Sequence, residues 1–135
     1  MTKRHARGGW TRALTPEDRA AIRDRCDRYI RTVLKSRFLP DIRPTPFNYP
    51  VDIFGKWRGD KYSFITRYRS GFPENMGEEF AAPFTRLDHV AFGPGGHRFN
   101  VMWFRHTGKW WRLHEGVTLD YALRHIETDP LLHPV

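Results

Sequence analysis

Apolar residues recur at helical spacing in the first third of the chain. From Thr15 onward they fall on one side of a helical wheel, whereas Arg28, Arg31 and Lys35 point the other way. This pattern predicts an amphipathic helix that begins at Thr15 and ends before Pro40. Its apolar positions are Ile22, Cys26, Tyr29, Ile30, Val33 and Leu34.

Local signals at two threonines mark where helices start. Thr15 supplies an N-cap hydroxyl, Pro16 suits the first helical position, and the acids that follow are favoured by the helix dipole. Thr118, with Asp120 in the first turn, predicts a short second helix over residues 119–127 that ends before Pro130.

Between these helices the pattern shifts to the alternation of strands. Residues 40–50 contain four prolines and predict a stiff connector, and residues 70–83 predict a long loop. The fold class is therefore α+β: the N-terminal amphipathic helix packs on an antiparallel meander sheet of about five strands, with a short C-terminal helix. The other face of the sheet is open to solvent or a ligand. The predicted strands are 51–57, 61–69, 84–92, 98–106 and 109–115.

Length and composition favour one domain. We expect residues 1–14 to form a flexible basic arm, with Trp10 as a possible anchor, and residues 15–135 to form a single α+β domain. Cys26, the one cysteine, excludes an intramolecular disulfide and is expected in the core. No apolar stretch resembles a signal peptide or membrane span, so we expect a cytoplasmic protein without membrane contact.

Positive charge is concentrated near the N-terminus. The net charge is +8, and residues 1–43 hold 12 basic against 5 acidic residues, whereas residues 44–135 hold 11 against 10. Such a field attracts nucleic acid or an acidic protein. The alternative is a solvated surface, because most of the basic residues are arginine, as in proteins from GC-rich genomes.

The final hairpin carries the candidate binding residues. A two-residue turn at Thr107-Gly108 would pair each tryptophan with an arginine across the strands on one face, suited to bases and phosphates. A three-residue loop would instead mix the two faces, with Phe104 opposite Arg112 and Met102 opposite His114. Under the first pairing the core face holds Met102, Phe104, Trp111 and Leu113. The candidate ligand-binding residues on the other face are Trp103, Arg105, Trp110, Arg112 and His114, beside Val101.

The first hairpin is expected to turn at Gly59-Asp60. Asp52 then lies opposite Arg67 as a structural ion pair, and both sides of the hairpin carry apolar residues. That distribution predicts a position in the middle of the sheet. Phe54 and Ile65 fall on one side, and Val51, Ile53, Trp57, Tyr62, Phe64 and Tyr68 on the other.

Catalytic and metal chemistry have weaker support. The seven histidines show no metal-ligand spacing, so we expect no metal and no cofactor. A small hydrolase or nuclease could use His114 with Arg105 and Arg112. GPGGH at 93–97 precedes a strand and indicates a turn. The acidic residues Glu74, Glu78 and Glu79 could dock the basic arm, or the arm of another copy in a homo-oligomer.

The segments VMWFR and KWWRL, followed by the short acidic-capped helix, resemble a family of small uncharacterised bacterial proteins classed only as a domain of unknown function. The resemblance covers about residues 15–130 and implies no established activity, cofactor or catalytic residue. This chain departs from the family pattern in its longer basic arm and its 70–83 loop.

The leading hypothesis is a binding module rather than an enzyme, which contacts nucleic acid through its arm and its Arg/Trp sheet face. The alternatives are the small hydrolase and a protein-interaction, immunity-type partner that meets an acidic protein. The arm residues expected to contact nucleic acid are Lys3, Arg4, Arg7 and Arg12.

Overall fold

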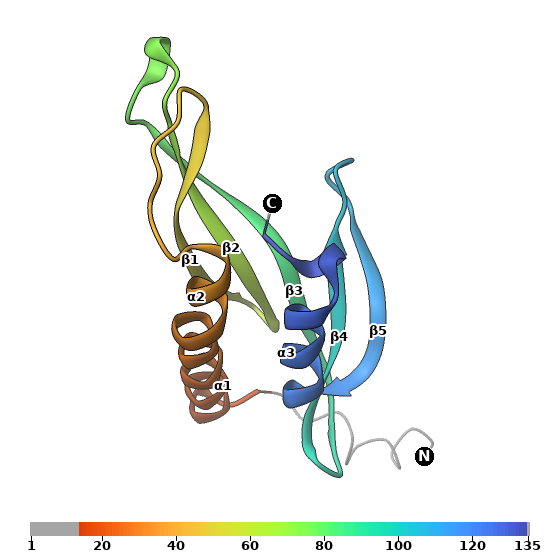
Figure 1. Ribbon diagram of the computed structural model, residues 1–135. Helices are drawn as coiled ribbons and strands as arrows, with labels where there is room; N and C mark the ends of the chain where they lie inside the picture. Colours follow the sequence, from red (N-terminus) through yellow and green to blue (C-terminus); the bar gives the residue numbers. More distant parts are fainter. Residues whose placement is uncertain (1–13, 135) are drawn as a thin grey trace.

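The computed structural model describes residues 14–134 and has the expected α+β architecture (Figure 1). Its five strands form one antiparallel sheet in the order β1-β2-β3-β4-β5, so each strand pairs with the next along the chain. The helical segments are α1 (Pro16–Tyr29), the π-helical η2 (Ile30–Leu34), α2 (Lys35–Phe38), η3 (Pro73–Asn75), α3 (Leu119–Thr128) and η4 (Pro130–Leu132). The strands are β1 (Asn48–Arg58), β2 (Lys61–Ser70), β3 (Glu79–Gly93), β4 (Gly96–Phe104) and β5 (Trp110–Thr118).

The first helix begins where the sequence predicts. The Thr15 hydroxyl accepts a hydrogen bond from the Asp18 amide at 3.0 Å, and the Asp18 carboxylate accepts one from the Thr15 amide at 3.0 Å. This reciprocal pair is a capping box. The helical path then continues through η2 and α2 to Phe38, and so ends before Pro40 as expected.

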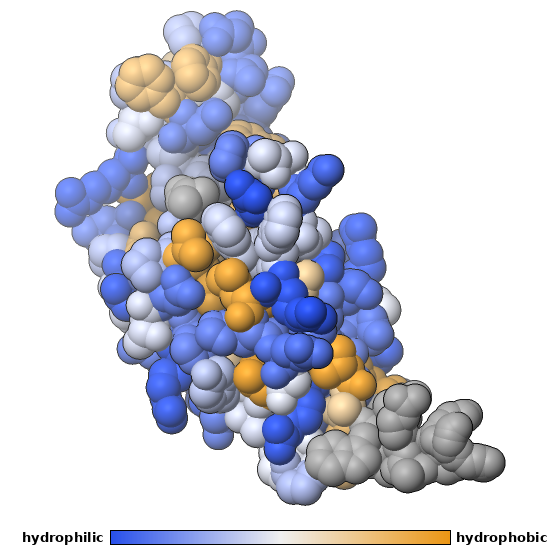
Figure 2. Space-filling view, turned by 90° about the vertical axis from the view of Figure 1, so that its right-hand side faces the viewer, coloured by the Kyte–Doolittle hydropathy of each residue, from blue (hydrophilic) through white to orange (hydrophobic). Residues whose placement is uncertain are grey.

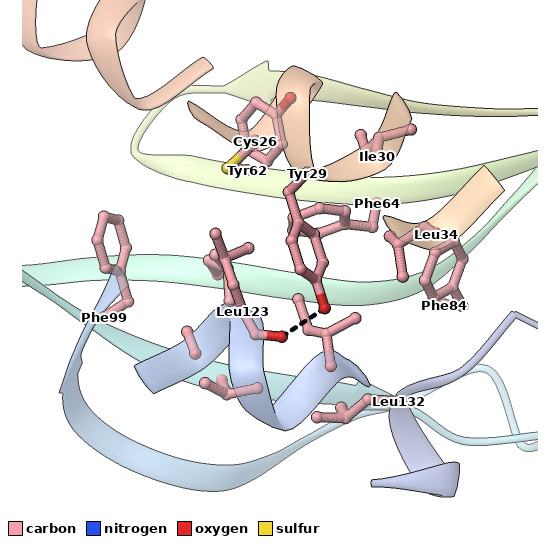
Figure 3. Close-up of a cluster of buried hydrophobic side chains, with 14 of the residues drawn as sticks. Cys26, Tyr29, Ile30, Leu34, Tyr62, Phe64, Phe84, Phe99, Leu123 and Leu132 are labelled. Carbon is pink, nitrogen blue, oxygen red and sulfur yellow. Dashed lines mark hydrogen bonds between the residues drawn. The ribbon is translucent and has the colours of Figure 1, made fainter. Parts of the chain in front are cut away.

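The α1 and α3 helices lie on the same face of the sheet (Figure 1). The first contacts β1, and the second contacts β4 and β5. The core fills the space between them, where Cys26 is fully buried as predicted. The Tyr29 hydroxyl donates a hydrogen bond to the Leu123 carbonyl at 2.7 Å and so joins the two helices directly (Figure 3). Other large buried side chains are Tyr62, Phe64, Leu87, Phe99, Val101, Ile126 and Leu132.

Hydrophilic residues cover much of the side of the molecule shown in Figure 2, with small groups of apolar atoms near its middle. Within residues 14–134, no helix is long and apolar enough to cross a membrane.

The third strand is longer than predicted. It begins at Glu79 rather than at residue 84, which shortens the predicted 70–83 loop. Phe80 pairs with Tyr68 of β2, and a register shift lies next to Pro83. A proline cannot donate to a strand ladder, and the bulge at this point accommodates it.

The first hairpin turns at Gly59-Asp60 as predicted, but its expected position in the middle of the sheet is wrong. Trp57 faces Tyr62 and Asp52 faces Arg67, whereas β1 is an edge strand. The apolar ring on the outer side, Phe54, is covered by the Arg67 guanidinium, whose carbon lies 4.7 Å from the ring centroid. The stacked Arg67 therefore shields the Phe54 ring. From the apolar residues on both sides of the hairpin, the sequence predicts that this side is buried.

The predicted Asp52–Arg67 ion pair is present, with 3.6 Å between its charged atoms. Lys35 Nζ also lies 2.8 Å from Asp52 Oδ1 and forms a second ion pair with it. Lys35, which the helical pattern assigned to the solvent side, thus ties α2 to the edge strand.

The predicted two-residue turn of the last hairpin is wrong. The Arg105 amide donates to the Lys109 carbonyl at 2.9 Å, which leaves a three-residue loop. Phe104 therefore pairs with Trp110 and Met102 with Arg112, partners that neither expected register gives. A shift of one residue moves a side chain to the other face of a strand. Further along, an irregularity restores the predicted pairing of Val101 with His114.

Candidate nucleic-acid interface

The altered register divides the residues expected to form one Arg/Trp face. Trp103 packs against the core cluster, on the face that carries the helices. The Arg105 guanidinium carbon lies 5.4 Å from the Trp103 ring centroid and 5.0 Å from that of Trp111. Trp110 and Arg112 lie on the opposite face, which we call the open face because neither α1 nor α3 covers it. The expected grouping is therefore wrong, while the binding role of each residue stays a prediction.

The predicted core residues of this hairpin are redistributed in the same way. Leu113 packs against the core as expected. Trp111 is half exposed, with 50% of its surface accessible, and Met102 and Phe104 pair with the open-face residues Arg112 and Trp110.

His114 lies against α3, with its ring centroid 4.0 Å from that of His125. Burial lowers the pKa of His114, and the neighbouring His125 lowers it further against an opposing effect of Asp129. The trio expected of a hydrolase is not brought together, because Arg112 lies on the open face and His114 lies beneath a helix.

The open face contains a hollow of about 330 Å³ that crosses from β1 to β5. Four of its lining side chains are cations and none is an acid. One aromatic ring, that of Trp110, completes it. The residues that line it are Lys56, Arg58, Lys61, Ser63, Ile65, Ala81, Pro83, Arg86 and Trp110.

The cations of this hollow differ in how they are held. Arg86 makes two hydrogen bonds to the Asp88 carboxylate, at 2.6 and 2.9 Å, and its guanidinium carbon lies 4.5 Å from the Trp110 ring centroid. Lys61 lies 3.4 Å from the Asp60 carboxylate at the rim. Lys56 and Arg58 are exposed, and in the described part of the chain neither makes an ion pair. They are the positive charges best placed to meet an external anion.

Lys56, Arg58, Lys61 and Arg86 are absent from the sequence-based candidates, although the pattern contained a signal for three of them. Lys56 and Arg58 are two residues apart in a strand, so their side chains share a face. Arg58 lies directly opposite Lys61 across the Gly59-Asp60 turn, which was predicted in the correct register. Arg86 comes from β3 and lines the same hollow only because β3 lies next to β2 in the sheet.

A second polar cluster ties the start of α1 to the β3–β4 hairpin. His97 Nε2 lies 3.3 Å from Asp18 Oδ1, and His97 Nδ1 lies 2.9 Å from His89 Nε2. His97 can donate from Nε2 to this carboxylate, while its Nδ1 shares a hydrogen bond with His89 Nε2. Since Asp18 also caps the helix, this chain of contacts serves the fold directly.

Two further observations concern metal ligands and the one cysteine in residues 14–134. No group of three or more histidine, cysteine or carboxylate side chains is placed to hold a metal ion. Burial raises the pKa of Cys26 to about 12, which disfavours the thiolate that a nucleophile would need. The predicted arm residues Lys3, Arg4, Arg7 and Arg12 lie outside the described residues.

Comparison with known proteins agrees with the resemblance in the sequence. A family model described as a domain of unknown function, DUF3024, matches residues 14–133. Searches of curated proteins and of solved structures found no match. Since the match spans nearly all of the chain, the protein belongs to the DUF3024 family.

Proposed function

We propose that this protein binds nucleic acid through the open face of its sheet. The observation that carries the proposal is the hollow of about 330 Å³, in which four cations and one tryptophan meet without an acidic side chain in the lining. Phosphate contacts supply most of the affinity of sequence-independent binding, and flat rings accept bases of any identity.

The positions of the charges fit a phosphate backbone that crosses the strands of the hollow. Lys56, Arg58 and Lys61 lie near the β1–β2 turn, on one side of the hollow. Arg86 and Trp110 lie on the other side, where the stacked guanidinium and indole offer planar groups to a base. The two acids nearest these cations, Asp60 and Asp88, are engaged by Lys61 and Arg86. The exposed Lys56 and Arg58 therefore carry the uncompensated charge.

This arrangement favours binding without sharp sequence specificity, because its charged groups are suited to phosphates. In this proposal the basic arm, with Lys3, Arg4, Arg7 and Arg12, adds a second, purely electrostatic contact.

The test is fluorescence anisotropy with labelled single-stranded and duplex oligonucleotides between about 50 and 200 mM salt. Affinity is expected to fall steeply as salt rises. The double variant Lys56→Gln/Arg58→Gln is expected to bind more weakly to all sequences and to flatten the slope of log K against log salt by about one unit per lost cation.

The matched control is Arg28→Gln/Arg124→Gln, which removes two exposed charges from α1 and α3, on the other side of the sheet. It is expected to retain most of the affinity. Equal losses in the two double variants would contradict the assignment of the face, and binding that is insensitive to salt, or no binding, would contradict the function. Binding to an acidic polypeptide such as polyglutamate, without binding to oligonucleotides, would indicate the acidic-protein alternative instead.

A further inference from the structure

A second hollow, of about 400 Å³, lies where the end of β4 and the β4–β5 loop approach the C-terminal segment. Apolar and aromatic side chains form much of its wall, and no acidic side chain lines it. Three groups in the wall can carry positive charge. The lining residues that define its chemistry are Phe84, Trp103, Arg105, His106, Leu131 and His133.

Arg105 is the most unusual group in this wall. Its guanidinium carbon lies within 5.4 Å of the ring centroid of Trp103 and 5.0 Å from that of Trp111. Among the described residues no hydrogen-bond acceptor or carboxylate meets this side chain, and its Nε is buried without a partner. Arg86 on the open face also stacks on a tryptophan, but there the Asp88 carboxylate satisfies it. Arg105 is therefore stacked on aromatic rings as Arg86 is, but among the described residues it has no carboxylate partner.

A guanidinium that rests on aromatic rings is oriented in advance for an anion. Stacking engages its flat face, while its N–H donors lie in the plane and match the two oxygens of a carboxylate. Because the rings limit the motion of the side chain, little further entropy is lost when an anion binds.

We propose that this hollow binds a small aromatic carboxylate, with the carboxylate on Arg105 and the ring among Trp103, Phe84 and Leu131. An apolar wall with few polar groups is typical of sites for small ligands, and the volume lies within their usual range. A nucleotide fits less well, because the carbon-rich wall offers few partners for sugar hydroxyls and base edges. This binding is therefore proposed for a different hollow from the one that contacts nucleic acid, although Pro83 lines both.

The first experiment compares two probes of nearly equal shape, 2-naphthoate and the neutral 2-naphthamide, by titration calorimetry on the full chain. Naphthoate is expected to bind about 10- to 100-fold more tightly, since a hydrogen bond to a charged group accounts for a difference of that order. Indole N–H signals in nitrogen-edited NMR spectra should shift for Trp103 and Trp111 but not for Trp57. Equal affinity for the two probes, or no naphthoate binding at millimolar concentration, would overturn the proposal.

Substitutions of Arg105 then test whether this residue binds the carboxylate. Arg105→Gln should reduce the preference for naphthoate over naphthamide to near unity, and Arg105→Lys should recover only part of it because lysine lacks the planar fork. Arg112→Gln, on the same hairpin but the opposite face, is the matched control and should bind naphthoate as the wild type does. Undiminished preference in Arg105→Gln would overturn the assignment. If Arg105→Gln does not fold, the comparison of naphthoate with naphthamide on the wild type still tests whether the hollow prefers a carboxylate.

The two proposals can fail separately. Lys56→Gln/Arg58→Gln should leave naphthoate affinity unchanged, and saturating naphthoate should leave oligonucleotide affinity unchanged. Competition between naphthoate and an oligonucleotide would show instead that this hollow belongs to the nucleic-acid site, and would overturn the assignment to a separate small ligand.

Discussion

Arg86 of β3 lies over the indole of Trp110 of β5, 4.5 Å from the ring centroid, although β4 separates their two strands. The contact crosses β4 on the open face and joins the cationic part of the hollow to its aromatic side. The Asp88 carboxylate holds the guanidinium from the side through two hydrogen bonds. The contact shows that Trp110 lies on the open face, because a tryptophan on the helix-bearing side could not reach Arg86.

Neighbouring tryptophans on opposite faces allow a direct test of the interface. Trp110→Ala should weaken oligonucleotide binding by about 1–3 kcal/mol, the usual contribution of base stacking on an aromatic ring. Trp111→Ala is the matched control, since the residue is adjacent in sequence and half exposed but lies on the side of Arg105. Anisotropy titrations of the two variants give the comparison. Weaker binding in Trp111→Ala than in Trp110→Ala would place the contact on the other face.

His114 predicts that stability depends on pH in the mildly acidic range. Its pKa is lowered from 6.5 by burial and by His125, so the folded protein binds this proton less readily than the unfolded chain. Above the unfolded pKa the histidine is neutral in both states and contributes no difference. As pH falls below it the unfolded chain takes up the proton first, and the folded state loses stability.

Urea unfolding at about pH 8 and about pH 5.5 measures this effect. The variant His114→Gln should lose less stability on acidification than the wild type does. His106→Gln, which removes an exposed histidine from the neighbouring loop, should behave as the wild type. The explanation fails if the wild type and His114→Gln lose equal amounts.

Gly55 of β1 has no room for a larger side chain. A Cβ atom at this position would lie 2.0 Å from the Tyr62 hydroxyl oxygen. Tyr62 cannot easily retreat, since it is fully buried, packs edge-on against Trp57 and contacts the Asp27 carboxylate at 3.3 Å. Gly55→Ala should therefore lower the free energy of unfolding by about 2–3 kcal/mol.

A comparison of Gly55→Ala with Gly108→Ala by denaturant unfolding separates the cost of a steric clash from the cost of backbone strain. A Cβ atom on Gly108 meets nothing within 4 Å, but the residue has a φ of +83°. That substitution should cost only about 1 kcal/mol, from the left-handed backbone conformation. Similar losses in the two variants would show that Tyr62 moves aside at little cost.

Signals that act within a few residues predicted much of the fold. The hydroxyl of Thr15 and the carboxylate of Asp18 form their capping box within one helical turn, so the start of α1 depends on no distant contact. The Gly59-Asp60 turn likewise fixed its own register, and with it the pairs Trp57–Tyr62 and Asp52–Arg67. The apolar face of the first helix identified Cys26 as a core residue for the same local reason.

The candidate site depended on contacts that local signals do not encode. Thr107-Gly108 is compatible with a loop of two or three residues, and the choice of three moved Trp103 and Trp110 to opposite faces. The sequence determined which residues are aromatic and charged, and where the helices and the first turn begin. Only the tertiary structure decided which face each side chain of the last hairpin occupies and that Arg86 meets Trp110, because the register and order of the strands depend on packing summed over the whole sheet.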